Sequence, residues 1–163
     1  MREDQEETRK EKLARLLAKN KTRLARDLLI KRYQQELRYP LAATQFVDLE
    51  VSHSIKKEVY QKIRTLPDQN ISASQPIFMP LHHLEKQAKV LSDVWVLFYY
   101  LDTLETEGIR IQFRDFWNIL HYIENNPRTD IILVEERLAF GICVELEEYN
   151  HLLMSWGFTD SPG

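Results

Sequence analysis

Two pairs of side chains in this sequence have the spacing of metal ligands. Glu50 lies three residues before His53, and Glu148 lies three residues before His151. Residues three apart share one face of a helix, so both members of a pair can reach one ion. Two such pairs, completed by single carboxylates on two further helices, form the di-metal site of ferritin-like bundles. The single carboxylates would be Glu36 and either Asp93 or Glu105.

A ferritin-like di-metal protein is nevertheless the least favoured hypothesis. Glu50 is expected to precede the start of its helix, which would keep the first pair out of a bundle core. The chain is also rich in glutamate and has five histidines, so pairs with this spacing arise by chance. We therefore predict no metal site and no cofactor.

The sequence carries no signature of catalysis. It lacks a glycine-rich phosphate loop, a GxSxG motif, a CxxC pair and an HExxH motif, so we predict that the protein is not an enzyme. The single cysteine, Cys143, lies between two aliphatic residues and is predicted to be a buried structural thiol. Because it cannot form an internal disulfide, a reducing, cytoplasmic location is expected. The longest apolar run, residues 94–101, is too short to span a membrane.

The placement of glycine favours a mainly α fold. Only four glycines occur, and Gly108 and Gly157 each follow a helix-like segment and precede an apolar residue. Glycine in this position is typical of a helix C-terminus. We therefore predict a single helical bundle of about five helices with a long basic amphipathic N-terminal helix. The expected helices cover residues of about 6–38, 53–66, 81–107, 112–125 and 126–156.

The last of these helices has an alternative. Residues 131–146 are rich in strand-forming side chains, and Gly141 inside a helix would cost about 1 kcal/mol relative to alanine. An α+β fold with a short hairpin at 131–146 is therefore the second prediction.

Charge is divided unevenly along the chain. Residues 1–38 contain twelve Lys or Arg and seven Asp or Glu, whereas the remaining residues contain ten and eighteen. The two parts thus carry net charges of +5 and −8. This asymmetry predicts a basic N-terminal arm over residues 1–38 attached to a helical globular domain over residues 39–163.

The basic arm also has an apolar stripe. Leu13, Leu17, Leu24 and Leu28 recur at helical spacing, with Leu16 beside them. Four interpretations follow: a solvated helix whose leucines pack on the core, a helix that pairs with a partner, a phosphate-binding helix, and a helix lying on an anionic membrane surface.

We favour a non-enzymatic protein–protein interaction module, acting as an adaptor, assembly or regulatory factor through a protein partner or self-association. A nucleic-acid-binding protein that contacts phosphates through the N-terminal helix is the alternative. An acidic face of the last helix would provide a counter-surface for the basic arm. The residues predicted to bind a partner are Lys12, Leu13, Arg15, Leu17, Lys19, Arg23, Leu24 and Arg26 on the arm, and Glu135, Glu136, Glu145 and Glu148 on the acidic face.

Overall fold

The structure is a computed structural model. It describes residues 2–72, 81, 84, 90–103, 106–123, 127–148 and 150–158, with side chains described from residue 8 onwards. The helices are α1 (Arg2–Glu36), α2 (Leu49–Ile63) and α5 (Phe113–Ile123), and a short 3-10 helix, η1, covers Ala43–Gln45. The strands are β1 (Gln69–Ser72), β2 (Trp95–Tyr99), β3 (Ile109–Gln112), β4 (Ile131–Glu135), β5 (Gly141–Leu146) and β6 (Asn150–Trp156).

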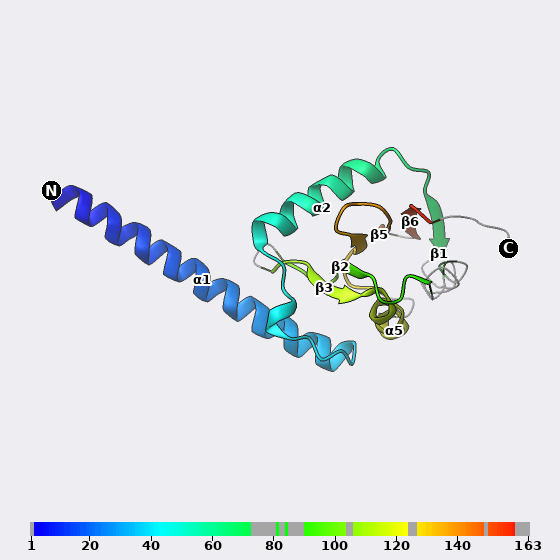
Figure 1. The fold of residues 1–163 in the computed structure, drawn as a ribbon, viewed down its shortest axis with the longest axis horizontal. Coiled ribbons are helices and arrows are strands. Elements are labelled where there is room, and N and C mark those ends of the chain that lie inside the picture. The colour runs from blue at the N-terminus through cyan, green and yellow to red at the C-terminus, as the bar shows by residue number, and fades with distance from the viewer. Residues whose placement is uncertain are drawn as a thin grey trace.

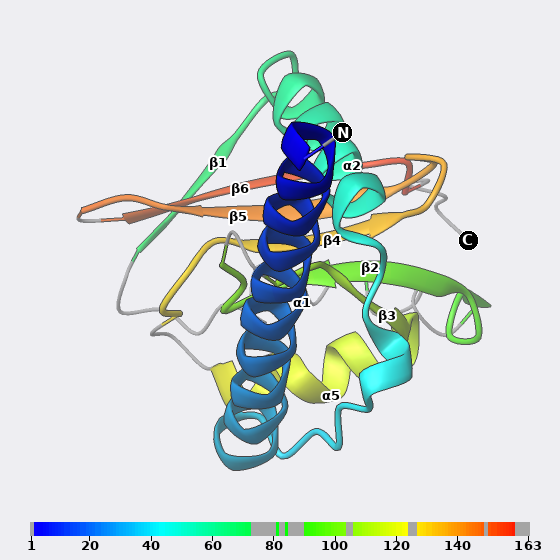
Figure 2. The ribbon, with the colours of Figure 1, turned by 90° about the vertical axis from the view of Figure 1, so that its left-hand side faces the viewer.

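The six strands form one antiparallel sheet in the order β1-β6-β5-β4-β2-β3. Helix α2 covers one face of the sheet, and α5 lies on the opposite face (Figures 1 and 2). The last turns of α1 pack on the same face as α5. The body of the protein therefore has three layers, with the sheet in the middle.

Each face of the sheet has its own apolar core. On the α2 face, Val59 and Ile63 of the helix pack in a cluster with Trp156 of β6. On the other face, Tyr33 of α1 and Phe116 of α5 belong to a larger aromatic cluster. Because both faces are covered, the central strands are apolar on both sides and lack the alternating pattern of a half-exposed strand.

The predicted helical bundle is wrong. Residues 95–99, inside the helix expected at 81–107, form the buried strand β2. The helix expected at 126–156 is replaced by β4, β5 and β6. The alternative, an α+β fold with a hairpin at 131–146, is the one that fits, since β4 and β5 pair across these residues.

The three other predicted helices are present in the structure. The helix expected at 112–125 is α5, and the helix expected at 6–38 is α1. Helix α2 begins earlier than expected, because Asp48 caps it by accepting hydrogen bonds from the backbone N–H groups of Glu50 and Val51, at 3.0 and 3.3 Å. Glu50 consequently lies inside the helix rather than before it.

Neither Gly108 nor Gly157 ends a helix, so the signal that suggested an α fold has a different origin. A methyl group at Gly108 would lie 2.7 Å from the ring of Tyr99, so glycine allows this ring to pack on the backbone. Gly157 follows β6 with a φ of +78°, a conformation that favours glycine. Gly108 thus allows close contact between neighbouring strands, and Gly157 allows the chain after β6 to pass close to the β4–β5 turn.

Helix α1 divides into an exposed part and a packed part. The helix extends away from the body in Figure 1, and its side chains from residue 8 to residue 21 are exposed. Among the side chains described from residue 8 onwards, Leu29 is the first buried one of the helix. Tyr33 then anchors the helix, since its buried hydroxyl donates a hydrogen bond to the Tyr100 carbonyl oxygen at 2.8 Å. The predicted arm of residues 1–38 is therefore only partly free of the body, and we restrict the term arm to the projecting residues 8–28.

Candidate functional site

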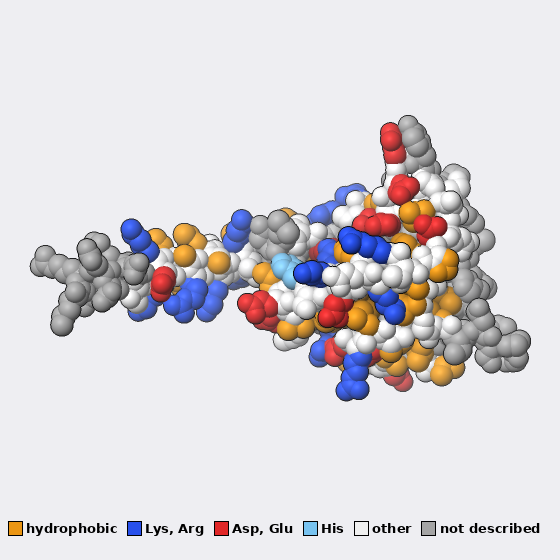
Figure 3. Space-filling view, turned by 90° about the horizontal axis from the view of Figure 1, so that it is seen from above, with side chains coloured by type: hydrophobic (Ala, Val, Ile, Leu, Met, Phe, Trp, Pro, Cys, Tyr) orange, Lys and Arg blue, Asp and Glu red, His pale blue; other side chains and the backbone are white. Residues whose placement is uncertain are grey.

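The arm exposes an apolar surface. We define the leucine stripe as the side chains of Leu13, Leu16, Leu17, Leu24 and Leu28. Each of them is 57% to 64% exposed, so the interpretation in which these leucines pack on the core is wrong. Figure 3 shows hydrophobic side chains interspersed with Lys and Arg along the projecting helix.

The leucine stripe points away from the body. Successive residues of an α-helix are rotated by about 100°. On this basis Leu29 and Tyr33, which are buried against the body, lie roughly 150° to 170° around the helix from the centre of the stripe. The stripe therefore cannot close on the body of its own chain unless α1 rotates or unfolds.

Arg26 fixes that rotation. Its guanidinium group donates to both carboxylate oxygens of Glu107, with an Nε–Oε2 distance of 3.0 Å, and lies 5.1 Å from the ring centre of Phe46. The Glu107 side chain is only 2% exposed. The hydrogen bond to Glu107 raises the pKa of Arg26 and outweighs the opposing effect of partial burial. A bidentate pair of this kind has a defined geometry, so Arg26 acts as a positioning residue for the arm.

A groove of about 620 Å³ runs between the arm and the segment before α2. We call it the basic groove. Four of the predicted partner-binding residues, Arg15, Lys19, Arg23 and Arg26, line it from α1. Ala43 and Asp48 lie across from them, and Ala18, Thr22 and Asp27 complete the lining. The structure thus brings these four cations together, whereas Lys12 is not part of the lining.

The predicted acidic residues do not form one surface. Glu135 accepts hydrogen bonds from the N–H groups of Arg137 and Ala139 in the β4–β5 turn, and Glu136 next to it pairs with Arg110. Glu145 and Glu148 lie toward the opposite end of the hairpin, at the end of β5 and in the β5–β6 turn. Because these residues occupy strand ends rather than one helix face, the expected counter-surface is divided in two.

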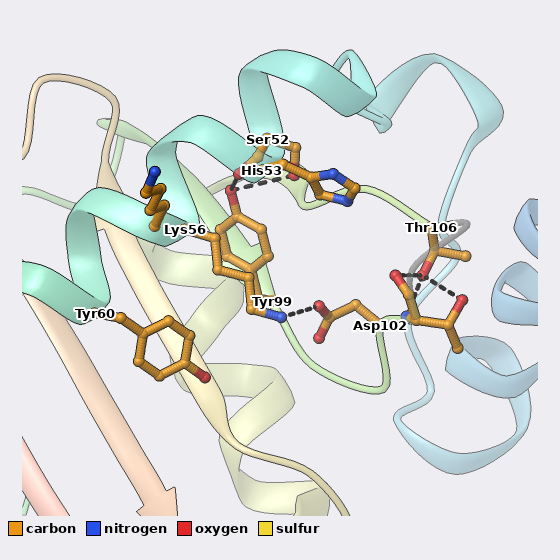
Figure 4. A pocket seen from close by; sticks show the side chains of 9 residues that line it. Ser52, His53, Lys56, Tyr60, Tyr99, Asp102 and Thr106 are labelled. Carbon is orange, nitrogen blue, oxygen red and sulfur yellow. Dashed lines mark hydrogen bonds and ion pairs between the residues drawn. The ribbon is translucent and has the colours of Figure 1, made fainter.

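A second hollow lies between α2 and the loop after β2 (Figure 4). We call it the α2 hollow; its volume is about 520 Å³. Lys56 crosses it to reach Asp102, with 2.6 Å between Nζ and Oδ2. The Tyr60 hydroxyl donates to Asp130 Oδ2 at 3.1 Å on its far side. The remaining lining residues are Ser52, His53, Lys57, Tyr99, Thr103 and Thr106.

The hydroxyl groups of the α2 hollow are engaged in structural bonds. The Ser52 Oγ accepts from the N–H of Gly108 at 2.7 Å, and the Tyr99 hydroxyl donates to the Ser52 carbonyl at 2.8 Å. Burial raises the pKa of Tyr99 to about 12 and that of Tyr60 well above its ordinary value. These groups are therefore protonated hydrogen-bonding groups at neutral pH, suited to holding a polar molecule rather than to attacking one.

The metal hypothesis depends on a bundle that the protein does not form. Glu50 and His53 share α2, but Glu148 lies in a turn and His151 in β6. The part of the chain with described positions contains no group of three or more His, Cys, Asp or Glu that could hold a metal ion. Of the proposed single carboxylates, Glu36 pairs with Arg32 and Arg128, Asp93 pairs with Arg114, and Glu105 lies outside the described residues.

The prediction for Cys143 is confirmed, since the free thiol is fully buried between the sheet and α2. Burial, followed by the nearby carboxylate of Asp130, raises the pKa of the thiol from 9.0 to about 12. A thiol with this pKa carries almost no thiolate at neutral pH and is a poor nucleophile.

The raised pKa values predict a loss of stability in alkali. Above about pH 9 the unfolded chain releases protons that the native protein still holds, so the free energy of unfolding decreases as the pH rises. Cys143 alone should contribute a loss of roughly 2 kcal/mol between pH 8 and pH 10.5, which urea denaturation at the two pH values would measure. Cys143→Val, which has no thiol, should lose less stability over the same range; an equal loss would show that the thiol does not contribute.

The geometry defines an α+β domain in which a six-stranded antiparallel sheet lies between helices and carries a projecting basic helix. The chain belongs to the YxiF protein family, whose model matches residues 29–156. That match begins at the buried Leu29 of α1, so it includes the α2 hollow and excludes the leucine stripe. No curated protein and no solved structure matches the chain. No helix among the described residues is long and apolar enough to cross a membrane.

Sequence reasoning missed the residues that face the arm from the body. Glu107, Phe46 and Asp48 lie in loops or next to short elements. Nothing in their local sequence indicates a contact with Arg26, which precedes each of them by 20 residues or more. The Lys56–Asp102 pair in the α2 hollow was missed for the same reason. Their positions follow from the sheet topology, which the sequence did not reveal.

Proposed function

We propose that this protein is a non-enzymatic protein–protein interaction module whose arm binds a helix of a partner protein through the leucine stripe. The observation that supports the proposal most directly is the direction of the stripe. Five leucines, each more than half exposed, lie on the side of α1 that faces away from the body. A contiguous apolar surface of this kind is typical of an interaction site.

The apolar contribution can be estimated from the exposed area. Burying the remaining part of one such leucine contributes roughly 1–2 kcal/mol, so the stripe offers roughly 5–10 kcal/mol in total. Association itself costs about 4–15 kcal/mol in lost freedom of motion. The stripe alone therefore supports only weak binding, and a specific complex needs additional polar contacts beside it.

The charges beside the stripe favour a different protein over a second copy of this chain. Lys10 and Lys21 flank the stripe on one side, and Lys12 and Arg23 flank it on the other. Pairing two copies along this face would place cations next to cations, which is unfavourable in a coiled coil. A partner with acidic flanking residues avoids this repulsion.

Nucleic-acid binding is the second candidate function. Lys12, Arg15 and Lys19 are exposed, and side chains of this type neutralise phosphates without reading bases.

We further propose that the protein acts in the cytoplasm, because its only cysteine is a buried free thiol.

The proposal is tested by an NMR titration of the full chain with a neutral amphipathic peptide. The peptide has leucines at helical spacing and glutamine or alanine elsewhere, and NMR detects the weak binding expected for the stripe alone. We expect chemical-shift changes confined to residues 13–28, and their loss in a Leu17→Gln/Leu24→Gln variant. Because both leucines are exposed, this variant should keep the wild-type Tm. Shift changes centred on the body, or unchanged binding by the variant, would contradict the proposal.

A further inference from the structure

We propose that the α2 hollow binds a small organic phosphate, whose phosphate group is held by His53, Lys56 and Lys57 of α2. This inference goes beyond the proposed function, because it concerns the body of the protein and not the arm. It stands or falls independently of the leucine stripe. Four observations support it.

The first observation is the arrangement of three donor side chains on α2. Lys56 and Lys57 lie three and four residues after His53, and all three line the hollow. Residues three and four apart are neighbours on a helix surface, with about 5–6 Å between their Cβ atoms. Figure 4 shows His53 and Lys56 extending from α2 toward the loop that carries Asp102. Side chains placed in this way can donate hydrogen bonds to one anionic group together.

The second observation is the charge of the hollow. Among the described residues that line it, Asp102 has the only carboxylate, against the ammonium groups of Lys56 and Lys57. Lys56 pairs with this carboxylate, but an ammonium group has three donor hydrogens, so donors remain for a ligand. A phosphate monoester has three acceptor oxygens and a charge of about −1.5 to −2 at neutral pH. Its phosphate group therefore matches the donors and the positive charge of the hollow.

The third observation indicates where in the hollow the phosphate lies. A smaller cavity of about 180 Å³ shares Lys56 and Asp102 with the hollow and is also lined by Asp130. His53 and Lys57 line only the larger hollow. A phosphate group is repelled by the two carboxylates of the smaller cavity and attracted to the lysines of the larger one. The phosphate is therefore expected beside His53 and Lys57.

The fourth observation is that the walls of the hollow are held in place without a ligand. The buried Ser52 fixes α2 by accepting a hydrogen bond from the Gly108 N–H at 2.7 Å. The 2.6 Å contact between Lys56 and Asp102 joins α2 to the opposite wall. A preformed site loses less free energy on binding.

The size of the hollow favours an organic phosphate over the free ion. Its volume of about 520 Å³ lies within the range of roughly 300–1,000 Å³ that is typical of small-molecule sites. A phosphate group at one end of the hollow therefore leaves room for an organic part beside it.

The test is an NMR titration of the full-length protein with glucose 6-phosphate, inorganic phosphate and glucose. Salt at about 0.15 M screens the exposed cations of the arm. We expect glucose 6-phosphate to shift the backbone signals of residues 52–57 and Asp102, and glucose to leave them unchanged. Inorganic phosphate should shift the same signals but bind more weakly, because it does not contact the rest of the hollow.

Three outcomes of the titration would contradict the inference. Unchanged signals at the hollow, or larger changes in the arm than in α2, would overturn it. Equal affinities for glucose 6-phosphate and inorganic phosphate would overturn its organic part and assign the site to the free ion.

Two matched variants locate the phosphate. Lys57→Gln and Arg64→Gln each remove one exposed positive charge at α2, but only Lys57 lines the hollow. We expect Lys57→Gln to weaken the binding of glucose 6-phosphate about fivefold, and Arg64→Gln to weaken it less than about twofold. An equal loss in both variants would mean that the anion is attracted only by the overall charge, which would overturn the inference.

A third variant should have the opposite effect. Asp102→Asn removes the carboxylate from the hollow and leaves the ammonium group of Lys56 free to bind the phosphate. We expect about fivefold tighter binding of glucose 6-phosphate. Damage to the shape of the hollow would weaken binding instead. Weaker binding by a variant that keeps the wild-type Tm would therefore overturn the inference.

Discussion

The Arg26→Met variant is expected to lower the free energy of unfolding by about 3–5 kcal/mol at neutral pH. The change leaves Glu107, whose side chain is 2% exposed, as a buried carboxylate without its partner. It also removes the packing of the guanidinium group on Phe46. Urea denaturation followed by circular dichroism would measure the loss.

A double variant separates the charge pair from the packing around it. Methionine has a volume close to that of glutamate, so Arg26→Met combined with Glu107→Met replaces a buried ion pair with apolar side chains. Replacements of this type are often neutral for stability, so the double variant should recover most of what the single variant loses. If the double variant is as unstable as Arg26→Met alone, the unpaired carboxylate is not the cause.

The pair also determines what the arm can do. Arg26 and Glu107 are 81 residues apart, and their contact sets the face of α1 that turns toward the body. The double variant should be stable but should lack this fixed orientation.

The two elements predicted well from the sequence are those with the simplest periodicity. The residues of α5 repeat their apolar side chains at helical spacing, and Phe113, Phe116 and Leu120 are buried as this pattern predicts. The arm has the same kind of repeat, and its existence as a helix was predictable. Its exposure was not, because the periodicity of a helix is the same whether its apolar stripe meets the core or another protein.

The favoured prediction missed the central strands β2, β4 and β5 because they are buried on both faces. The apolar run at residues 94–101 suits a helix surrounded by others as well as a strand covered on both sides, so periodicity alone cannot distinguish them. Length is the better guide. β2 has only five residues, and the pairs of apolar segments in β4, β5 and β6 are separated by turns that an uninterrupted helix would have to cross.

The candidate site was predictable only on one side. The cations of the basic groove come from a single helix, and their clustering along the sequence indicated them directly. Their neighbours across the groove come from the segment 43–48 and from Glu107, which meet the arm only after the sheet has formed. Contacts between residues so distant in the sequence leave no local pattern. The body side of the groove and the α2 hollow therefore could not be predicted from the sequence and follow only from the three-dimensional structure.

The Gly157→Ala variant is expected to lose at least about 3 kcal/mol of unfolding free energy. At the φ of +78° found there, any side chain adds strain of about 1–3 kcal/mol. The added methyl group would also lie 2.6 Å from the Cα of Phe140, and closer still to the carbonyl oxygen of Ala139. Because both contacts are with the β4–β5 turn, the backbone must separate there. Urea denaturation would measure the loss.

The neighbouring Ser155→Ala variant provides the matched control. Ser155 is exposed on β6, so its replacement should change the stability by less than about 0.5 kcal/mol. A loss below about 1 kcal/mol for Gly157→Ala would mean that the β4–β5 turn can move aside with little loss of unfolding free energy. The structure argues otherwise, because Phe140 in that turn packs against Phe113 and Phe158, with ring centres 5.5 and 5.3 Å away. Moving the turn therefore disturbs the corner where α5 meets the sheet, and the effect of one methyl group extends into the core.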